Sequence, residues 1–89
     1  MDSNVVIQLH KTVKDGKQEV TQLSLRRPKA IDLDVMDEAK GSHAGMRKLI
    51  SRLACVSQPA VDDLDGFDYN AASKVVNDFL LVAPPIGTI

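Results

Sequence analysis

Two stretches of alternating apolar and polar residues, separated by a turn, constrain the first third of the chain. Residues 4–11 place apolar side chains at every second position, and residues 19–25 follow the same alternation. A period of two is typical of a β-strand with one buried face. Between the two stretches lies Lys14-Asp15-Gly16-Lys17, whose Asp-Gly pair favours a tight turn. The segment therefore predicts an antiparallel β-hairpin.

The register of this hairpin follows from the requirement that both apolar sets share one face. A two-residue Asp-Gly loop would pair Leu9 with Gln22 and send the two sets to opposite faces. A three-residue loop of residues 14–16, with Gly16 left-handed in a bulge, instead gives one apolar face. The pairs it predicts are Val5–Leu25, Ile7–Leu23, Leu9–Thr21 and Lys11–Glu19.

Three helices are predicted beyond the hairpin. Pro28 ends the second strand, because the residue before a proline is restricted to extended geometry. Residues 30–40 carry several acidic side chains, which disfavour a strand and suit the first half of a helix. Residues 43–56 and residues 65–81 both carry apolar stripes with helical spacing. A connector over residues 57–64, opened by Pro59, has room for one further helical turn.

The helix boundaries are predicted from capping residues. Gly41 is a natural stop, and the Ser42 hydroxyl can cap the next helix. Asp65 and Asp68 have the spacing of an N-cap and an acidic N3 residue. Prolines follow the last helix and leave residues 83–89 as an extended, mostly apolar tail.

The expected fold class is α+β, an N-terminal two-stranded hairpin followed by three short helices (ββααα). With 89 residues the chain forms one domain: a hairpin over residues 1–28, a helical part over residues 29–82 and the tail. Its longest apolar run is far below the roughly 20 residues that a membrane helix needs, and the N-terminus lacks a signal pattern. A single cysteine gives no internal disulfide. These features predict a cytoplasmic protein.

No pattern in the chain points to catalysis, a metal or a cofactor. His10, His43 and Cys55 lie far apart in sequence on three predicted elements, without the short ligand pairs of a zinc site. A run of carboxylates does not match an EF-hand loop, so we assign it to capping and solvation. The members of this run are Asp62, Asp63, Asp65 and Asp68. The sequence thus predicts a protein that is not an enzyme and has no small-molecule substrate.

Nucleic-acid binding is the alternative that the basic residues keep open. Two groups could meet phosphates, one after the second strand and one on the middle helix. They are Arg26, Arg27 and Lys29, and Arg47, Lys48 and Arg52. A net charge of -1 and only three aromatic residues (two Phe, one Tyr) argue against this use. Pairing of the basic helix with the acidic connector explains the same residues.

The order of these features resembles the small tail assembly chaperones of Mu-like and related contractile-tailed phages and prophages. Apolar spacings and caps carry the resemblance over about residues 5–80. They are Val20-x-x-Leu23-x-Leu25-Arg26-x-Pro28, Asp32-Leu33, Leu49-Ile50-x-x-Leu53, Leu64-Asp65-x-x-Asp68-Tyr69 and Val75-Val76-x-x-Phe79-Leu80.

The resemblance implies a chaperone that binds the tape measure protein in the cytoplasm of the bacterial host. Such proteins keep the tape measure soluble, leave as tail tube protein polymerises around it, and are absent from the finished virion. A long, helical, apolar client requires apolar grooves on its carrier. Carrying it also favours many copies, so we expect self-association through an edge of the hairpin. The alternative is a small prophage-encoded DNA-binding regulator.

We predict that the partner binds at the seam between the middle and last helices. The residues of this seam are Met46, Leu49, Leu53, Val76 and Phe79. The same apolar stripes would also serve as the core of the domain, and both interpretations stay open at this point.

Overall fold

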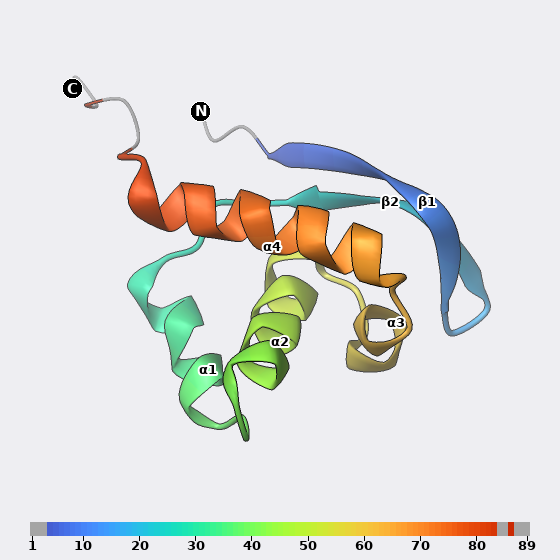
Figure 1. Ribbon diagram of the computed structural model, residues 1–89, viewed down its shortest axis with the longest axis horizontal. Helices are drawn as coiled ribbons and strands as arrows, with labels where there is room; N and C mark the ends of the chain where they lie inside the picture. The colour runs from blue at the N-terminus through green and yellow to red at the C-terminus, as the bar shows by residue number, and fades with distance from the viewer. Residues whose placement is uncertain (1–3, 84–85, 87–89) are drawn as a thin grey trace.

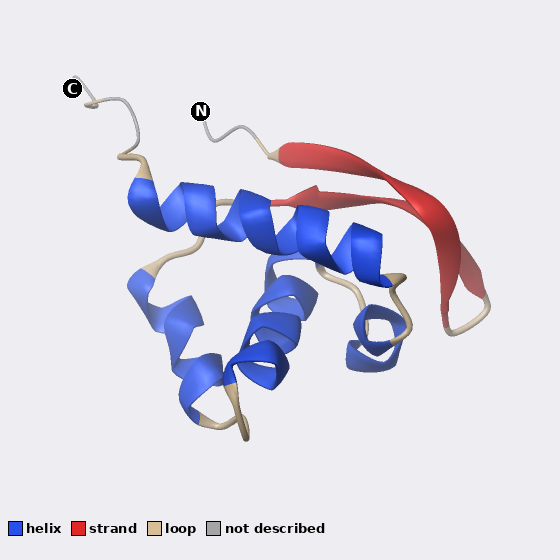
Figure 2. Cartoon of the chain, in the orientation of Figure 1, coloured by secondary structure: helices blue, strands red, loops and turns tan. Residues whose placement is uncertain are grey.

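A two-stranded hairpin and a layer of helices make up the structure, a computed structural model that describes residues 4–83 and residue 86. The helices cover one face of the hairpin, and the longest of them runs along it (Figure 1). In chain order the elements are β1 (Val5–Asp15), β2 (Gln18–Leu25), a 3-10 turn (Ala30–Leu33), α1 (Asp34–Asp37), α2 (Ser42–Ala54), α3 (Gln58–Asp62) and α4 (Gly66–Leu81). The α+β class and the hairpin-first order are therefore confirmed (Figure 2).

The helical part differs from prediction at its start. The helix expected over residues 30–40 is present only in part: a 3-10 turn over Ala30–Leu33 leads directly into the four-residue α1, which ends at Asp37. The cause is Asp32, whose buried side chain bonds the backbone of Lys29 and two arginines instead of facing water. Helix α3 is the extra turn that the connector had room for. Of the predicted extended tail, only Ala83 and Ile86 are among the described residues.

Two of the predicted caps have different outcomes. Asp65 caps α4 as expected, because its side chain accepts a hydrogen bond from the backbone N–H of Phe67 at 3.0 Å. The predicted Ser42 cap is wrong, since α2 begins at Ser42 itself and its N-cap is Gly41. Gly41 has a φ of 114°, a conformation that glycine adopts without the clash of a Cβ atom.

The register of the hairpin is as predicted at its open end and shifted near its turn. Val5 pairs with Leu25 and Ile7 with Leu23, which confirms the expected apolar face. The predicted pairs Leu9–Thr21 and Lys11–Glu19 are wrong. Residues 9–12 of β1 instead bulge opposite Thr21 of β2, and the turn is formed by Gly16 and Lys17. The observed pairs beyond the bulge are Val13–Val20, Lys14–Glu19 and Asp15–Gln18.

The bulge is held by the carboxylate of Asp68, which is only 1% exposed. Both oxygens of Asp68 accept from the backbone N–H of His10 at 3.0 Å, and Oδ2 accepts from the N–H of Lys11 at 3.1 Å. The His10 ring lies 3.2 Å away, Nδ1 to Oδ1. Asp68 was expected to act at the helix terminus or in solvent. It binds the strand instead, because the bulge presents amides that pair with no strand.

A second buried carboxylate, Asp32, joins the end of the hairpin to the helices. The guanidinium of Arg26 binds it with two hydrogen bonds of 2.7 and 2.9 Å, and Arg52 of α2 adds one of 2.6 Å. The backbone N–H of Lys29 donates a fourth at 2.7 Å. A bidentate guanidinium pair fixes orientation as well as distance. This cluster therefore sets where the chain leaves β2 and how α2 approaches it.

The core lies between the hairpin and the helices. Its fully buried apolar side chains come from β2 and from every helix after α1. They are Leu23, Leu25, Leu49, Ile50, Leu53, Val61, Ala72 and Val76. Among the residues described, no helix is both long and apolar enough to cross a membrane.

The two buried carboxylates make stability depend on pH. Hydrogen bonds from Arg26, opposed by burial, hold the pKa of Asp32 well below its ordinary value. For Asp68, burial acts to raise the pKa, but the bonds from His10 and Lys11 together outweigh it and the pKa is lowered. Since both groups bind protons more weakly when folded, they stabilise the fold above the unfolded aspartate pKa of about 3.9.

We therefore expect the melting temperature to be nearly constant from pH 7 to about pH 5 and to fall as the pH drops below about 4. Thermal unfolding followed by circular dichroism at each pH measures this. The variant Asp68→Ala, with one such carboxylate fewer, should lose less stability over the same range. A melting temperature that holds down to pH 3 would show that neither carboxylate is coupled to folding.

Candidate partner-binding surfaces

The five residues predicted to bind a partner occupy two different environments. Leu49, Leu53 and Val76 are at most 1% exposed and belong to the core cluster. In this conformation no partner reaches them without parting the helices from the hairpin. Met46 and Phe79 are partly buried at the edge of that core. The structure brings all five together around one core but leaves only these two at the surface.

Met46 and Phe79 line separate hollows rather than one seam. The hollow at Phe79, here called the Phe79 groove, has a volume of about 410 Å³ and lies between the start of β1 and the end of α4. The hollow at Met46, here called the Met46 hollow, has a volume of about 420 Å³ and lies between α4 and the α1–α2 corner. The single seam of the prediction is thus divided by α4.

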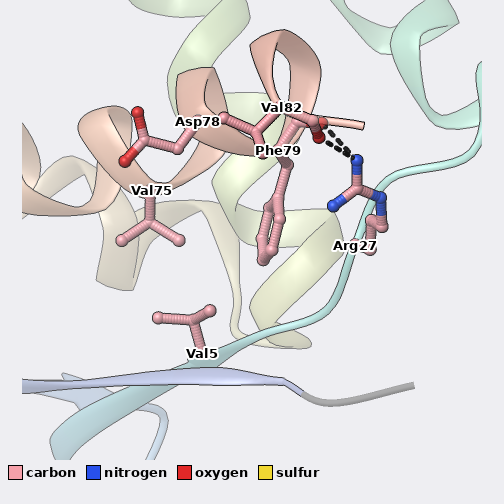
Figure 3. Close-up of a pocket in the computed structure, with 6 residues that line it drawn as sticks. All are labelled: Val5, Arg27, Val75, Asp78, Phe79 and Val82. Carbon is pink, nitrogen blue, oxygen red and sulfur yellow. Dashed lines mark hydrogen bonds between the residues drawn. The ribbon is translucent and has the colours of Figure 1, made fainter. Parts of the chain in front are cut away.

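The Phe79 groove is built from one face of α4 and two residues of the hairpin region. Its lining residues are Val5, Arg27, Val75, Asp78, Phe79 and Val82. The four from α4 and its C-cap have the i, i+3, i+4, i+7 spacing that puts side chains on one helix face. Val5 and Val75 face each other across the groove, with the Phe79 ring beside them (Figure 3).

Arg27 fixes the wall of this groove. Its Nη2 donates to the backbone oxygens of Phe79 at 2.7 Å and Val82 at 2.6 Å, and its guanidinium carbon lies 5.6 Å from the centre of the Phe79 ring. A cation at the last carbonyls of a helix satisfies groups that have no partner within the helix. Asp78 lies on the other side of Phe79 from Arg27 (Figure 3). The groove therefore has an apolar floor between two opposite charges.

The Met46 hollow has a different character. Its lining residues are Met36, Ser42, His43, Met46, Tyr69, Asn70, Ser73 and Asn77, with no Asp, Glu, Lys or Arg. His43 Nδ1 lies 2.8 Å from the Tyr69 hydroxyl and links α2 to α4 at its rim. The Ser73 hydroxyl is buried and has no hydrogen-bond partner among the described residues. Methionine side chains adapt to varied shapes, so this surface suits an uncharged, partly apolar partner.

The basic residues singled out by sequence are largely paired within the protein. Arg47 Nε lies 2.9 Å from Asp62 Oδ1, which confirms the expected pairing of the basic helix with the acidic connector. Arg26 and Arg52 share the carboxylate of Asp32. These arginines therefore present little unopposed positive charge to a phosphate backbone.

The residues considered for catalysis lie on different elements. His10 is in β1, His43 is in the first turn of α2, and Cys55 is the left-handed C-cap of α2. Within residues 4–83 and 86, no group of three or more His, Cys, Asp or Glu side chains could hold a metal ion.

Sequence reasoning considered Arg27 only as a possible phosphate contact, and it placed Val5 only on the apolar face of the hairpin. Arg27 lies 52 residues from Phe79, and nothing near it in sequence indicates that it binds the end of α4. The stripe of Val75, Phe79 and Val82 was the available signal, since it has helical spacing but lies on a different part of the helix circumference from the buried residues Ala72 and Val76.

Comparison with known proteins identifies the family. The chain matches the model of the family described as phage tail assembly chaperone proteins, E, or 41 or 14, over residues 6–81. No curated protein and no solved structure matches the chain. The matched region runs from the second residue of β1 to the last residue of α4. It includes every lining residue of the Met46 hollow, but of the Phe79 groove it leaves out Val5 and Val82. The protein therefore belongs to the phage tail assembly chaperone family.

Proposed function

We propose that this chaperone binds the tape measure protein in the cytoplasm of the bacterial host and keeps it soluble. It releases its client as tail tube protein polymerises around it, and it is not part of the finished virion. It acts by binding and not by catalysis. The observation that carries the proposal is the family match over residues 6–81.

The Met46 hollow is the surface we propose for the client. A carrier of a long helical protein has to bind many unlike segments, which favours a surface of flexible side chains over a rigid pocket. Met36 and Met46 supply such side chains, and the row of polar groups on α4 beside them offers hydrogen bonds without charge. The buried hydroxyl of Ser73 gains a partner if the client supplies one.

The DNA-binding alternative has less support. The carboxylates of Asp32 and Asp62 bind three of the arginines that a phosphate backbone would need. The net charge of -1 gives no general attraction to a polyanion.

Co-expression with the tape measure protein of the same phage or prophage tests the proposal. We expect the client to stay soluble and to co-purify with the chaperone at both low and high salt, because apolar contacts are little affected by ionic strength. Binding to nucleic acid would instead weaken steeply as salt is raised. An insoluble client with no bound chaperone would contradict the proposal.

The variant Met46→Lys locates the client surface. A charge in an uncharged hollow should reduce the co-purified client at least about tenfold, whereas the circular dichroism spectrum should not change because Met46 lies at the edge of the core. The matched control is Ile31→Lys, which places the same charge at an exposed apolar residue that lines neither hollow. Equal losses in both variants would remove the Met46 hollow from the proposal.

A further inference from the structure

The Phe79 groove is an apolar surface that the described part of the chain leaves open. Val82, on its wall, is 63% exposed, and Val5, opposite, is 37% exposed. The chain continues past Val82, but Ile86 is 94% exposed, so this aliphatic side chain does not fill the groove. Among residues 4–83 and 86 the groove is therefore an uncovered apolar surface, and such a surface suits an occupant.

Its charges indicate what that occupant carries. Arg27 and Asp78 line the groove on opposite sides of Phe79 (Figure 3). Only one nitrogen of Arg27, Nη2, is used in hydrogen bonds to α4, and Asp78 forms no ion pair among the described residues. A complementary surface must present an acid toward Arg27, a base toward Asp78 and apolar side chains between them.

A second copy of the same surface has this pattern. We infer that the Phe79 groove binds the Phe79 groove of a second copy, related by a two-fold axis through its centre. Rotation by half a turn places Asp78 of the second copy toward Arg27 and Arg27 of the second copy toward Asp78. The exposed Val82 side chains then meet the apolar floors of the facing grooves. Such an isologous contact closes on itself and gives a dimer.

The other occupants fit less well. An apolar client gains nothing from the opposite charges of Arg27 and Asp78, which it would have to desolvate. The sequence led us to expect self-association through either edge of the hairpin. The edge of β1 is partly used, because the amides of His10 and Lys11 already bind Asp68. The groove thus serves the second copy, and the Met46 hollow on the other side of α4 stays free for a client.

The oligomeric state of the full 89-residue chain tests this inference. Light scattering after size-exclusion chromatography should give twice the chain mass of 9.7 kDa for the unaltered protein. Asp78→Lys, which sets like charges against each other, and Val82→Asp, which puts a charge into the apolar contact, should each raise the dissociation constant at least about tenfold. Both residues are exposed, so the circular dichroism spectrum should not change.

Two matched variants serve as controls. Asp63→Lys makes the same charge change at an exposed aspartate outside the groove, and Ile31→Asp makes the same kind of apolar-to-acid change at an exposed side chain elsewhere. Both should remain dimeric. The Met46→Lys variant should also remain dimeric, which separates this inference from the client surface.

Three results would overturn the inference. One is an unaltered protein that stays monomeric up to about 1 mM. Another is a dimer that neither Asp78→Lys nor Val82→Asp weakens, which would place the contact elsewhere, such as at the hairpin edge. The third is a monomer whose client binding is lost in Val82→Asp, which would assign the groove to the client.

Discussion

The variant Leu53→Asp is expected to be unfolded at neutral pH. Leu53 is 1% exposed and lies in the cluster that joins α2 to β2 and α4. An ionised carboxylate there has no partner, and burying one costs more than about 4 kcal/mol in addition to the lost apolar contacts. Domains are stable by only about 5–15 kcal/mol, with short chains near the lower end. The measurement is far-UV circular dichroism with a thermal melt.

The control is the same substitution at the surface. Leu81, the last residue of α4, is 82% exposed, so Leu81→Asp should keep the spectrum and melt within a few degrees of the unaltered protein. If Leu53→Asp instead stays folded and loses its client, Leu53 is an interface residue and the core placed around it is wrong. The pair of variants therefore decides between the two interpretations that the apolar stripes left open.

The parts of the fold that follow from sequence are those set by local pattern. Leu23 and Leu25 alternate with polar residues, and burying both on one face leaves one register at the open end of the hairpin. The helical spacing around Leu49 and Leu53 identifies α2. Asp65 marks the start of α4, because its side chain accepts a hydrogen bond from Phe67, two residues further along the chain. Each of these signals lies within a few residues of the structure that it predicts.

The parts that did not follow depend on residues distant in sequence. The backbone amides of the bulge in β1 are bound by the carboxylate of Asp68, which is 58 residues away from His10 in sequence. The helix expected over residues 30–40 begins instead as a 3-10 turn and ends at Asp37, and Asp32 in that turn binds Arg52 of α2. The residues next to an aspartate in sequence do not tell whether it caps a helix, faces water or fills a buried site. Its role is therefore decided by tertiary contacts.

The same reason limits the prediction of the binding surface. Helical periodicity shows which side chains of α2 and α4 share a face of the helix. It does not show which of these faces are buried by neighbouring elements. In α4, Val76 is covered by the core, whereas Phe79 lies on a wall whose other side is Val5 of the hairpin. The predicted seam therefore contained both core residues and groove residues.

Removing the carboxylate that holds the bulge should be the second large effect. In Asp68→Ala the backbone N–H groups of His10 and Lys11 lose their acceptor, and we expect the free energy of unfolding to fall by about 2–4 kcal/mol. The measurement is urea unfolding followed by circular dichroism at pH 7. Unsatisfied amides in a partly buried bulge have no other strand to pair with, so the loss should be accompanied by faster hydrogen exchange at residues 9–12.

The matched control is Asp65→Ala, which removes the same charge from the same helix terminus. Asp65 caps α4 through the N–H of Phe67, and loss of such a cap costs about 1 kcal/mol. A loss in Asp68→Ala no larger than in Asp65→Ala would mean that the carboxylate acts only on the helix. A larger loss, accompanied by faster hydrogen exchange confined to the bulge, would show that a residue of the last helix holds the bulge that shifts the register of β1 near its turn.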